Sequence, residues 1–396
     1  MKINLKDQRM MPFVMCNVVI INVAVSLDIF PFLKPLSYLI LGLCLLSFMV
    51  MSYLFLRHPR MSAFDLTITM FLSFFMVFSF LNGTDFKNAI YISVAILLTL
   101  FLFKYYSHKT TFLIQSIAFA FSLCIYANLI FMILFTSWIV DASNDMGLFL
   151  LGGNYNQIGC RYICCMILNL MCIRYNKWWI VNTILVSLVS IGTLLIVGSM
   201  TSLSVIILFT LLIFIPSVKL QKFIFISWFG FYFLFHLFVV FNGEGLHNNE
   251  LAVYIVEDLL GKDITFTGRT YQWLSALDVI GKSPIWGYGN VDMEWYVSNM
   301  SSFAVGPHNF ILSILIFGGL ILLFLFLAIL SLSLLSLLQR PDKTYSILAL
   351  GIMSLLFMMT FETYPIYFIF LLLIIAFYYP LFIASNPITE KFFPNE

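Results

Sequence analysis

The stretch VGPHNFILSILIFGGLI, from Val305 to Ile321, indicates the class of protein to which this chain belongs. After Asn309 it is almost entirely apolar, as expected of a helix that crosses a membrane. Before that point stand a proline, a histidine and an asparagine, at the end of the longest polar segment in the chain. His308 therefore lies where polar chain meets apolar chain, either as a simple boundary residue or as a catalytic group.

Composition extends the membrane interpretation to the whole chain. Of its 396 residues, 62% are hydrophobic and only 10% are charged, whereas a soluble domain carries about 25% charged residues. A bilayer accommodates this much apolar surface in spans of about 20 residues each. We therefore expect an all-α polytopic membrane protein with a single integral membrane domain over residues 1–396. The net charge of +2 without a basic stripe predicts no nucleic-acid partner.

The apolar stretches predict about twelve transmembrane helices. They cover roughly residues 11–30, 36–56, 61–81, 88–103, 111–140, 157–173, 178–197, 201–217, 221–241, 308–338, 345–361 and 364–384.

The distribution of lysine and arginine predicts the orientation of these spans. With a cytoplasmic N-terminus, most basic residues fall in inner segments: Lys2, Lys6, Arg9, Arg57, Arg60, Lys104, Lys109, Arg174, Lys177, Lys219, Lys222, Arg340, Lys343 and Lys391. The outer segments hold fewer: Lys34, Lys87, Lys262, Arg269 and Lys282. Because cytoplasmic loops of membrane proteins are enriched in basic residues, this bias predicts that both termini are cytoplasmic. Arg161 remains inside a span.

One connection differs from all the others in length and composition. It is a large extracytoplasmic loop over about residues 242–307, and its tryptophans and tyrosines argue against a disordered linker. Within it, TGRTYQWLSALDVIGKSP has the apolar spacing of a short amphipathic helix that ends before Pro284. Arg269 stands at the start of that helix, where it is either a surface arginine or a ligand for an anion together with the free backbone N–H groups.

Several motifs, in this order along the chain, resemble those of one family. They are GGNYNQIG (152–159), GRTYQW (268–273), KSPIWGYGN (282–290) and PHNFILSILIFGG (307–319). This pattern is similar to that of the O-antigen polymerase and O-antigen ligase superfamily, whose members are bacterial multi-span glycosyltransferases that use polyprenyl-diphosphate-linked glycans. The likeness in topology extends along the full length of the chain.

The resemblance implies a function. It is the polymerisation of undecaprenyl-diphosphate-linked oligosaccharide repeat units into the O-antigen of lipopolysaccharide or into a capsule, on the outer face of the cytoplasmic (inner) membrane. Membrane lipids, a chain-length regulator and a flippase are the further partners it implies, and no cofactor or metal is expected. The first alternative is an O-antigen ligase that transfers polymer to a lipid acceptor. The second, a polysaccharide flippase or secondary transporter, is disfavoured because the two halves do not look repeated and Asp65 and Glu362 sit near span ends.

The chemistry of this reaction suggests roles for particular residues. A base must accept the proton of the acceptor hydroxyl, and His308 suits this role because the unperturbed pKa of histidine is about 6.5. Arginine binds phosphate bidentately, so Arg269 is the second predicted catalytic residue. The predicted substrate-binding residues are Arg161, Lys282, Asn309, Asn154, Asn156, Gln157, Trp273 and Tyr288. Among these the amides would orient sugar hydroxyls and the aromatic rings would stack on sugars.

The sequence departs from the family pattern at one position. Many members have a Ser-Arg pair where an outer turn enters the next span, and here Met200 stands in place of that arginine. Arg161 is the available substitute, because an arginine within a span is costly and is a functional candidate by default. The alternative is that Arg161 only reaches outward to the headgroups. Gly318 and Gly319 are expected to permit close helix packing.

Overall fold

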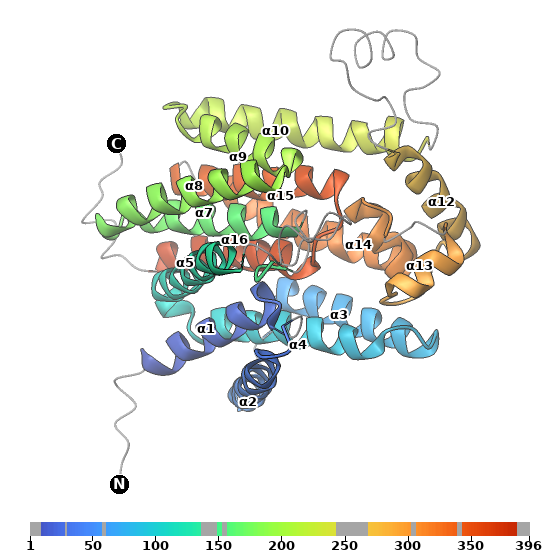
Figure 1. Ribbon diagram of the computed structural model, residues 1–396, viewed down its shortest axis with the longest axis horizontal. Coiled ribbons are helices and arrows are strands. Elements are labelled where there is room, and N and C mark those ends of the chain that lie inside the picture. Colours follow the sequence, from blue (N-terminus) through green and yellow to red (C-terminus); the bar gives the residue numbers. More distant parts are fainter. Residues whose placement is uncertain are drawn as a thin grey trace.

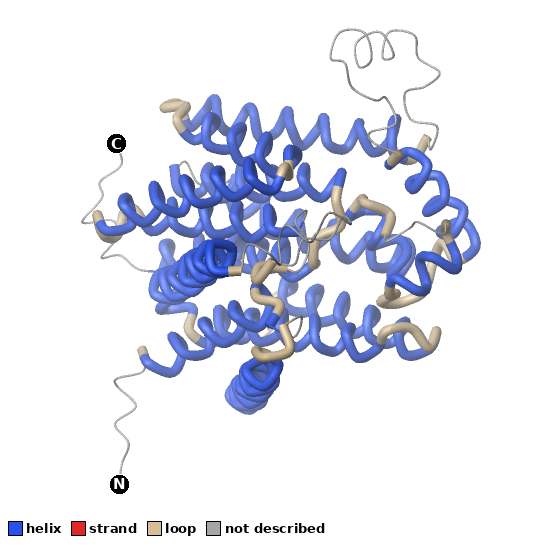
Figure 2. Tube along the Cα trace, viewed as in Figure 1, coloured by secondary structure: helices blue, strands red, loops and turns tan. Residues whose placement is uncertain are grey.

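The computed structural model describes residues 9–27, 30–57, 61–135, 149–152, 157–242, 268–301, 306–338 and 343–385. Over these ranges every regular element is a helix (Figures 1 and 2). The α-helices are α1 (Met10–Ala24), α2 (Lys34–Arg57), α3 (Ala63–Leu81), α4 (Phe86–Tyr105), α5 (Thr110–Leu134), α7 (Ile158–Cys172), α8 (Trp178–Val197), α9 (Met200–Ile213), α10 (Val218–Phe235), α12 (Arg269–Lys282), α13 (Met293–Asn299), α14 (Phe310–Leu338), α15 (Lys343–Phe361) and α16 (Ile366–Ser385). A short 3-10 turn (Ser107–Lys109) precedes α5, and a π-helical segment (His236–Val240) follows α10.

The helices agree with a polytopic membrane protein. Each of the twelve predicted spans overlaps one α-helix, and eight helices in the described ranges are long and apolar enough to cross a membrane. The shorter apolar segments are α1, α7, α9 and the Ile366–Tyr379 part of α16. The membrane class is therefore confirmed, whereas the count of twelve spans and their orientation stay predictions.

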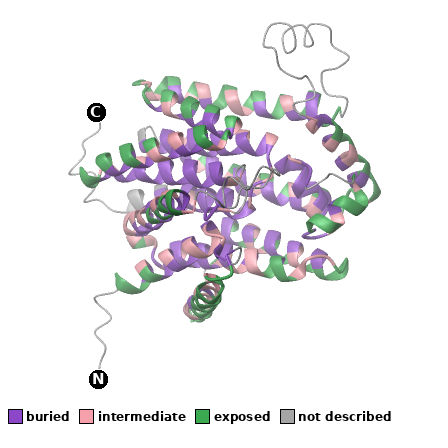
Figure 3. Cartoon of the chain, viewed as in Figure 1, coloured by how far each residue is buried: buried purple, intermediate pink, exposed green. Residues whose placement is uncertain are grey.

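The core and the periphery of the bundle are made by different helices. The described side chains of α16 are almost all buried, and this helix packs against α14, α4 and α15 (Figure 3). By contrast, α2, α8 and α10 present rows of exposed leucine, isoleucine and phenylalanine side chains. In water such surfaces would be unfavourable, but in a bilayer they meet lipid chains of similar polarity.

Two short helices stand apart from the apolar ones. The amphipathic helix predicted within the long loop is α12, which ends just before the Ser283–Pro284 turn. In Figure 1, α12 and α13 lie together at the right-hand end of the bundle. Trp273 of α12 is completely buried, against Phe235 and Phe361 at the ends of α10 and α15. This contact fixes the first turn of α12, which carries Arg269, against the end of α15.

The Gly318–Gly319 pair has a different role from the expected one. Instead of only allowing a continuous helix to pack closely, it breaks α14, because Gly318 has φ −159° and ψ 27° and Gly319 has φ 57° and ψ −151°. The conformation of Gly319 is accessible almost only to glycine. A Cβ atom on Gly319 would also lie 2.3 Å from the backbone carbon of Ile285.

The KSPIWGYGN motif fills this break with backbone hydrogen bonds. Tyr288 N–H donates to the carbonyl of Ile316 at 2.7 Å, and Gly289 N–H donates to that of Phe317 at 2.8 Å. On the other side of the break, Leu320 N–H donates to the Pro284 carbonyl at 2.8 Å. Non-helical backbone inside a membrane protein requires such internal partners. The two glycine-containing motifs are therefore one structural unit.

The same loop continues onto the turn between α3 and α4. Asn290 N–H donates to Ser79 Oγ at 2.7 Å, and Asp85 N–H donates to the Asn290 carbonyl at 2.8 Å. Gly289 passes so close to α3 that a Cβ atom would lie 2.3 Å from Ser79 Cα. These contacts hold the segment that leads into α13 beside a large, partly open cavity.

Candidate active site

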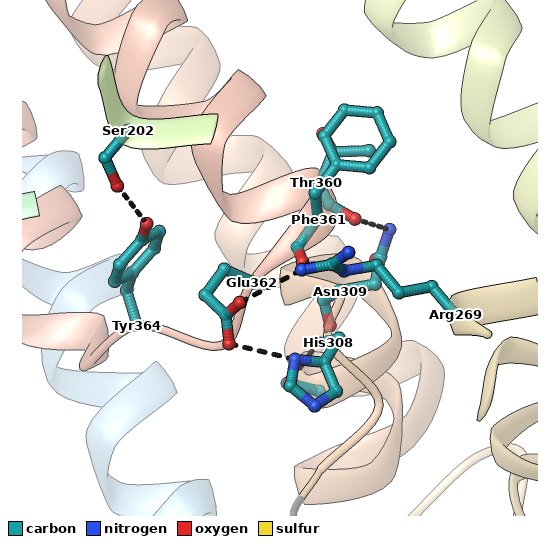
Figure 4. Close-up of polar contacts among 9 residues, drawn as sticks. Ser202, Arg269, His308, Asn309, Thr360, Phe361, Glu362 and Tyr364 are labelled. Atoms are coloured by element: carbon teal, nitrogen blue, oxygen red, sulfur yellow. Dashed lines mark hydrogen bonds and ion pairs between the residues drawn. The ribbon is translucent and has the colours of Figure 1, made fainter. Parts of the chain in front are cut away.

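Arg269 begins α12 and is directed at the C-terminal end of α15. Gly268 precedes it with φ 79°, a left-handed conformation that favours glycine. Arg269 Nε donates a hydrogen bond to the backbone carbonyl of Phe361, and Nη2 lies 3.3 Å from Glu362 Oε2 (Figure 4). Although Arg269 is the first residue of α12, its guanidinium therefore lies at the C-terminus of α15, where the negative end of that helix dipole favours a cation.

Glu362 joins the two residues that were predicted to be catalytic. Its Oε1 atom lies 2.9 Å from His308 Nδ1, while its Oε2 atom pairs with Arg269 (Figure 4). The Glu362 side chain is only 9% exposed. Because a carboxylate only accepts hydrogen bonds, Nδ1 of His308 carries a proton, and in the neutral tautomer of the imidazole the lone pair is on Nε2.

The functional interpretation of the sequence missed Glu362 as a site residue. It was noted only as an acid near a span end, since no local motif surrounds it. The signal available was a carboxylate at the end of an apolar stretch on the same predicted side as Arg269 and His308. Its pairing depends on the return of α15 to the start of α14, and this is a tertiary contact.

His308 has an uncommon backbone conformation. With φ 44° it is the one non-glycine residue with positive φ in the described ranges. Such conformations cost about 1–3 kcal/mol and persist where the surroundings impose them, often at functional sites. The adjoining Asn309 is fully buried and caps α14, because its Oδ1 atom accepts from Leu312 N–H at 3.1 Å.

The amide of Asn309 is engaged by the protein itself. Nδ2 donates to the Thr360 carbonyl at 3.2 Å and lies 3.1 Å from His236 Nε2. With Oδ1 also in a hydrogen bond, this side chain has no atom directed at a substrate. The prediction that Asn309 orients sugar hydroxyls does not fit this geometry.

A cavity of about 840 Å³ lies beside this cluster. It is bounded by α1, α2 and α4, by the start of α14, and by the segment that links α15 to α16. Thr363 and Tyr364, the two residues that follow Glu362, line its wall, as does Tyr296 of α13. Burial raises the pKa of Tyr296, so this side chain stays a neutral phenol.

Arg161 lines the same cavity and is buried, with 3% of the residue exposed. Its Nε atom donates to the Ala24 carbonyl at 2.9 Å, Nη1 donates to the Gln157 carbonyl at 2.7 Å, and Cζ lies 4.9 Å from the ring centre of Phe368. Over the described part of the chain, no carboxylate is within ion-pair distance of Arg161. Its side chain is buried instead of extending to the surface, and among the described residues this cation has no anionic partner.

The backbone around Arg161 is shaped to fit the guanidinium. Gly152, with φ 84°, lies so close that a Cβ atom there would come within 2.4 Å of Arg161 Nη1. Gly152 and Gln157 are the first and sixth residues of the GGNYNQIG motif, and both line the cavity. Asn154 and Asn156, which were predicted to bind substrate, lie outside the described residues.

Three other predicted substrate contacts do not line the cavity. Trp273 is completely buried and has no face available to a sugar. Tyr288 donates its hydroxyl to the Val279 carbonyl at 3.0 Å and packs on Trp295. Lys282 is exposed at the end of α12 and does not line the cavity.

Comparison with known proteins gives one family. Residues 146–327 match the family model described as O-antigen ligase. The matched range contains Arg161, Arg269 and His308 and ends before Glu362. The comparison with curated proteins gave no match, and neither did the comparison with solved structures.

Proposed function

The family match supports the O-antigen polymerase and ligase superfamily, and from that premise we propose a specific activity. The protein is a glycosyltransferase that polymerises polyprenyl-diphosphate-linked oligosaccharide repeat units on the outer face of the cytoplasmic membrane. The single observation that carries the proposal is the cluster in which Glu362 contacts both His308 and Arg269. The base and the cation that the reaction needs thus both contact the carboxylate of Glu362.

His308 acts as the general base. Its Nε2 atom takes the proton from a hydroxyl of the acceptor sugar while that oxygen forms a bond to the anomeric carbon of the donor. Glu362 holds Nδ1–H, so in the neutral imidazole the lone pair is on Nε2, and the carboxylate charge then stabilises the imidazolium that forms. The side chain of His308 is 16% exposed, so the ring is accessible to a substrate.

The leaving group is the polyprenyl diphosphate. As the bond from the anomeric carbon to the diphosphate oxygen breaks, the electron pair stays with the diphosphate, whose charge must be neutralised. Arg161 supplies a buried cation that no described carboxylate neutralises, beside a cavity within the usual 300–1,000 Å³ range of ligand sites. Arg269 contributes a second cation next to the base.

An O-antigen ligase is the second candidate, and the family description favours it as much as the polymerase. Both enzymes break the same bond in the donor and differ in the acceptor. Glycan analysis of a deletion strain separates them. Single repeat units on the final carrier indicate a polymerase, whereas full-length polymer that stays on the polyprenyl diphosphate indicates a ligase.

Transport is tested separately from transfer. The purified protein in detergent should extend a defined polyprenyl-diphosphate-linked repeat unit, and transport has no meaning without two compartments. The polymerase proposal predicts products that grow by whole repeat units. If the purified protein only binds the lipid-linked unit and never extends it, the polymerase proposal is wrong. A ligase, which needs a different acceptor, then has to be tested with that acceptor, and failure there as well makes a flippase or transporter the better interpretation.

A further inference from the structure

A second histidine is connected to the candidate active site through Asn309. His236 begins the π-helical segment that follows α10, and the residue is only 3% exposed. Its Nδ1 atom lies 2.9 Å from the Tyr232 carbonyl, and its Nε2 atom lies 3.1 Å from Asn309 Nδ2. Single π-helical turns within α-helices occur often at functional sites, and the proposed reaction assigns no role to this one.

The hydrogen bonds around Asn309 determine which nitrogen of His236 carries the proton. Asn309 Oδ1 accepts from Leu312 N–H, so the amide nitrogen Nδ2 is the atom that faces His236. An amide nitrogen can only donate. His236 Nε2 is therefore an acceptor, and the proton lies on Nδ1, where it is donated to the Tyr232 carbonyl.

These contacts hold Asn309 from three directions. Leu312 belongs to α14, Thr360 to α15, and His236 to the end of α10, so one buried amide connects three helices. The neighbouring His308 has the strained φ of 44°, which requires support from its surroundings. Glu362 fixes the ring of His308, and Asn309 fixes its backbone.

We propose that His236 is a positioning residue for His308: it accepts a hydrogen bond from Asn309 and so holds the backbone that aims Nε2 of His308 at the acceptor hydroxyl. This role rests on the proposed function, because it concerns the same base. The ring of His236 also packs on Tyr232, at 4.3 Å between ring centres. An experiment must therefore distinguish a packing role of the His236 ring from its role as a hydrogen-bond acceptor.

Three substitutions of His236 distinguish these two roles. His236→Gln places an acceptor near the position of Nε2, His236→Asn keeps a polar group only near Nδ1, and His236→Phe keeps the ring volume alone. Each variant is compared with the wild type in extension of a defined lipid-linked repeat unit by protein purified in detergent. We expect His236→Gln to stay within about threefold of the wild-type kcat, and His236→Asn and His236→Phe to lose roughly tenfold or more, with KM nearly unchanged.

A double-mutant cycle tests the route through Asn309. If His236 acts through that amide, His236→Phe should lower kcat by less than about twofold when Asn309→Ser is already present. Equal kcat values for the Gln, Asn and Phe variants would overturn the proposal, as would a His236→Phe effect that is undiminished in the Asn309→Ser background. Should His236→Phe fail to fold, the Gln and Asn variants still test the proposal, which requires a higher kcat for His236→Gln than for His236→Asn.

The outcome for His308 distinguishes this proposal from the proposed function. If His308→Ala abolishes extension while all three His236 variants behave as wild type, only the positioning role is wrong. If His308→Ala extends the lipid-linked unit normally, the assignment of the base fails, and the role of His236 fails with it.

Discussion

Two arginines close to one cavity differ in how their charge is balanced. Arg269, with 21% of its side chain exposed, pairs with Glu362, which also binds His308. Arg161 is more deeply buried, and over the described ranges it donates only to backbone carbonyls and a thiol. A buried charge without a counter-charge is costly. In the Arg269 cluster the ion pairs hold a fixed geometry, whereas the unbalanced charge of Arg161 is the basis for our proposal that this arginine binds the anionic part of the donor.

The difference suggests a division of labour within the proposed reaction. The cluster of Arg269, Glu362 and His308 fixes the direction of a base and supports the imidazolium that forms. The cavity around Arg161 gains stability when a diphosphate enters, because the ligand supplies the missing negative charge. Substitutions in the cluster should therefore lower kcat. Substitution of Arg161 should mainly raise KM, because the diphosphate is already charged when it binds, and should lower kcat only as far as Arg161 also stabilises the charge that develops as the bond breaks.

The largest effect is expected from His308→Ala in cells. Loss of the general base should lower polymer formation by roughly 10²- to 10⁴-fold, measured from the glycan ladder, while the amount of protein in the membrane stays normal. His108→Ala is the control, because His108 is exposed in the turn before α5. Wild-type chain lengths from His308→Ala would contradict the assignment.

The next effect is expected from Glu362→Gln. The amide of glutamine can donate to His308 Nδ1, which moves the imidazole proton to Nε2 and blocks the base. We expect kcat to fall about 10²-fold with little change in KM, measured with the purified protein. Glu294→Gln is the matched control, since Glu294 is exposed on α13. A fall that appears only in KM would mean that Glu362 binds substrate instead.

Arg161 is tested by two substitutions. Arg161→Ala removes a charge-assisted contact worth about 1.5–3 kcal/mol, which corresponds to roughly a 10- to 150-fold rise in KM for the lipid-linked donor. Arg161→Lys keeps the charge without the fork and should lie between the alanine variant and the wild type. If both variants bind and extend the donor as the wild type does, Arg161 does not take the role of the arginine that many family members have at the position of Met200.

Gly319→Ala should act on stability. A side chain at Gly319 would meet the backbone of Ile285 and would strain a conformation with φ 57°. We expect a loss of about 1–3 kcal/mol, seen as a lower midpoint of thermal unfolding in detergent. Gly192→Ala is the control, because nothing lies within 4 Å of its added Cβ on α8. Equal midpoints would show that the break in α14 does not need glycine.

The smallest effect is expected from Lys282→Ala. Lys282 is exposed at the end of α12, apart from the cavity and from the cluster. Extension rates should stay within about twofold of the wild type, as for most surface substitutions. A tenfold loss would place the anion site on the outer surface of α12 and weaken the assignment to Arg161.

Much of the fold was predictable from the sequence because apolar length is a local property. All twelve predicted spans coincide with helices, and α12 has the amphipathic spacing around Trp273. The break in α14 was not predictable. Gly318 and Gly319 are compatible with either close packing or a break, and the choice depends on hydrogen bonds from residues 284–289.

The candidate site was predictable in part for the same reason. His308 and Arg269 belong to recognisable motifs, so they could be chosen before the fold was known. Glu362 has no motif, and its importance follows from the meeting of α15 with the start of α14. Trp273 fits the pattern of a sugar-binding aromatic equally well, and only its complete burial shows that it packs α12 instead.

The most direct measurement of the central claim is a single-turnover reaction with purified protein and one defined polyprenyl-diphosphate-linked repeat unit. Wild-type protein and His308→Ala are compared at a donor concentration that saturates both. If His308 is the base held by Glu362, the wild type forms products longer by whole units and His308→Ala is slower by roughly 10²-fold or more. Extension at equal rates by the two proteins would contradict the account.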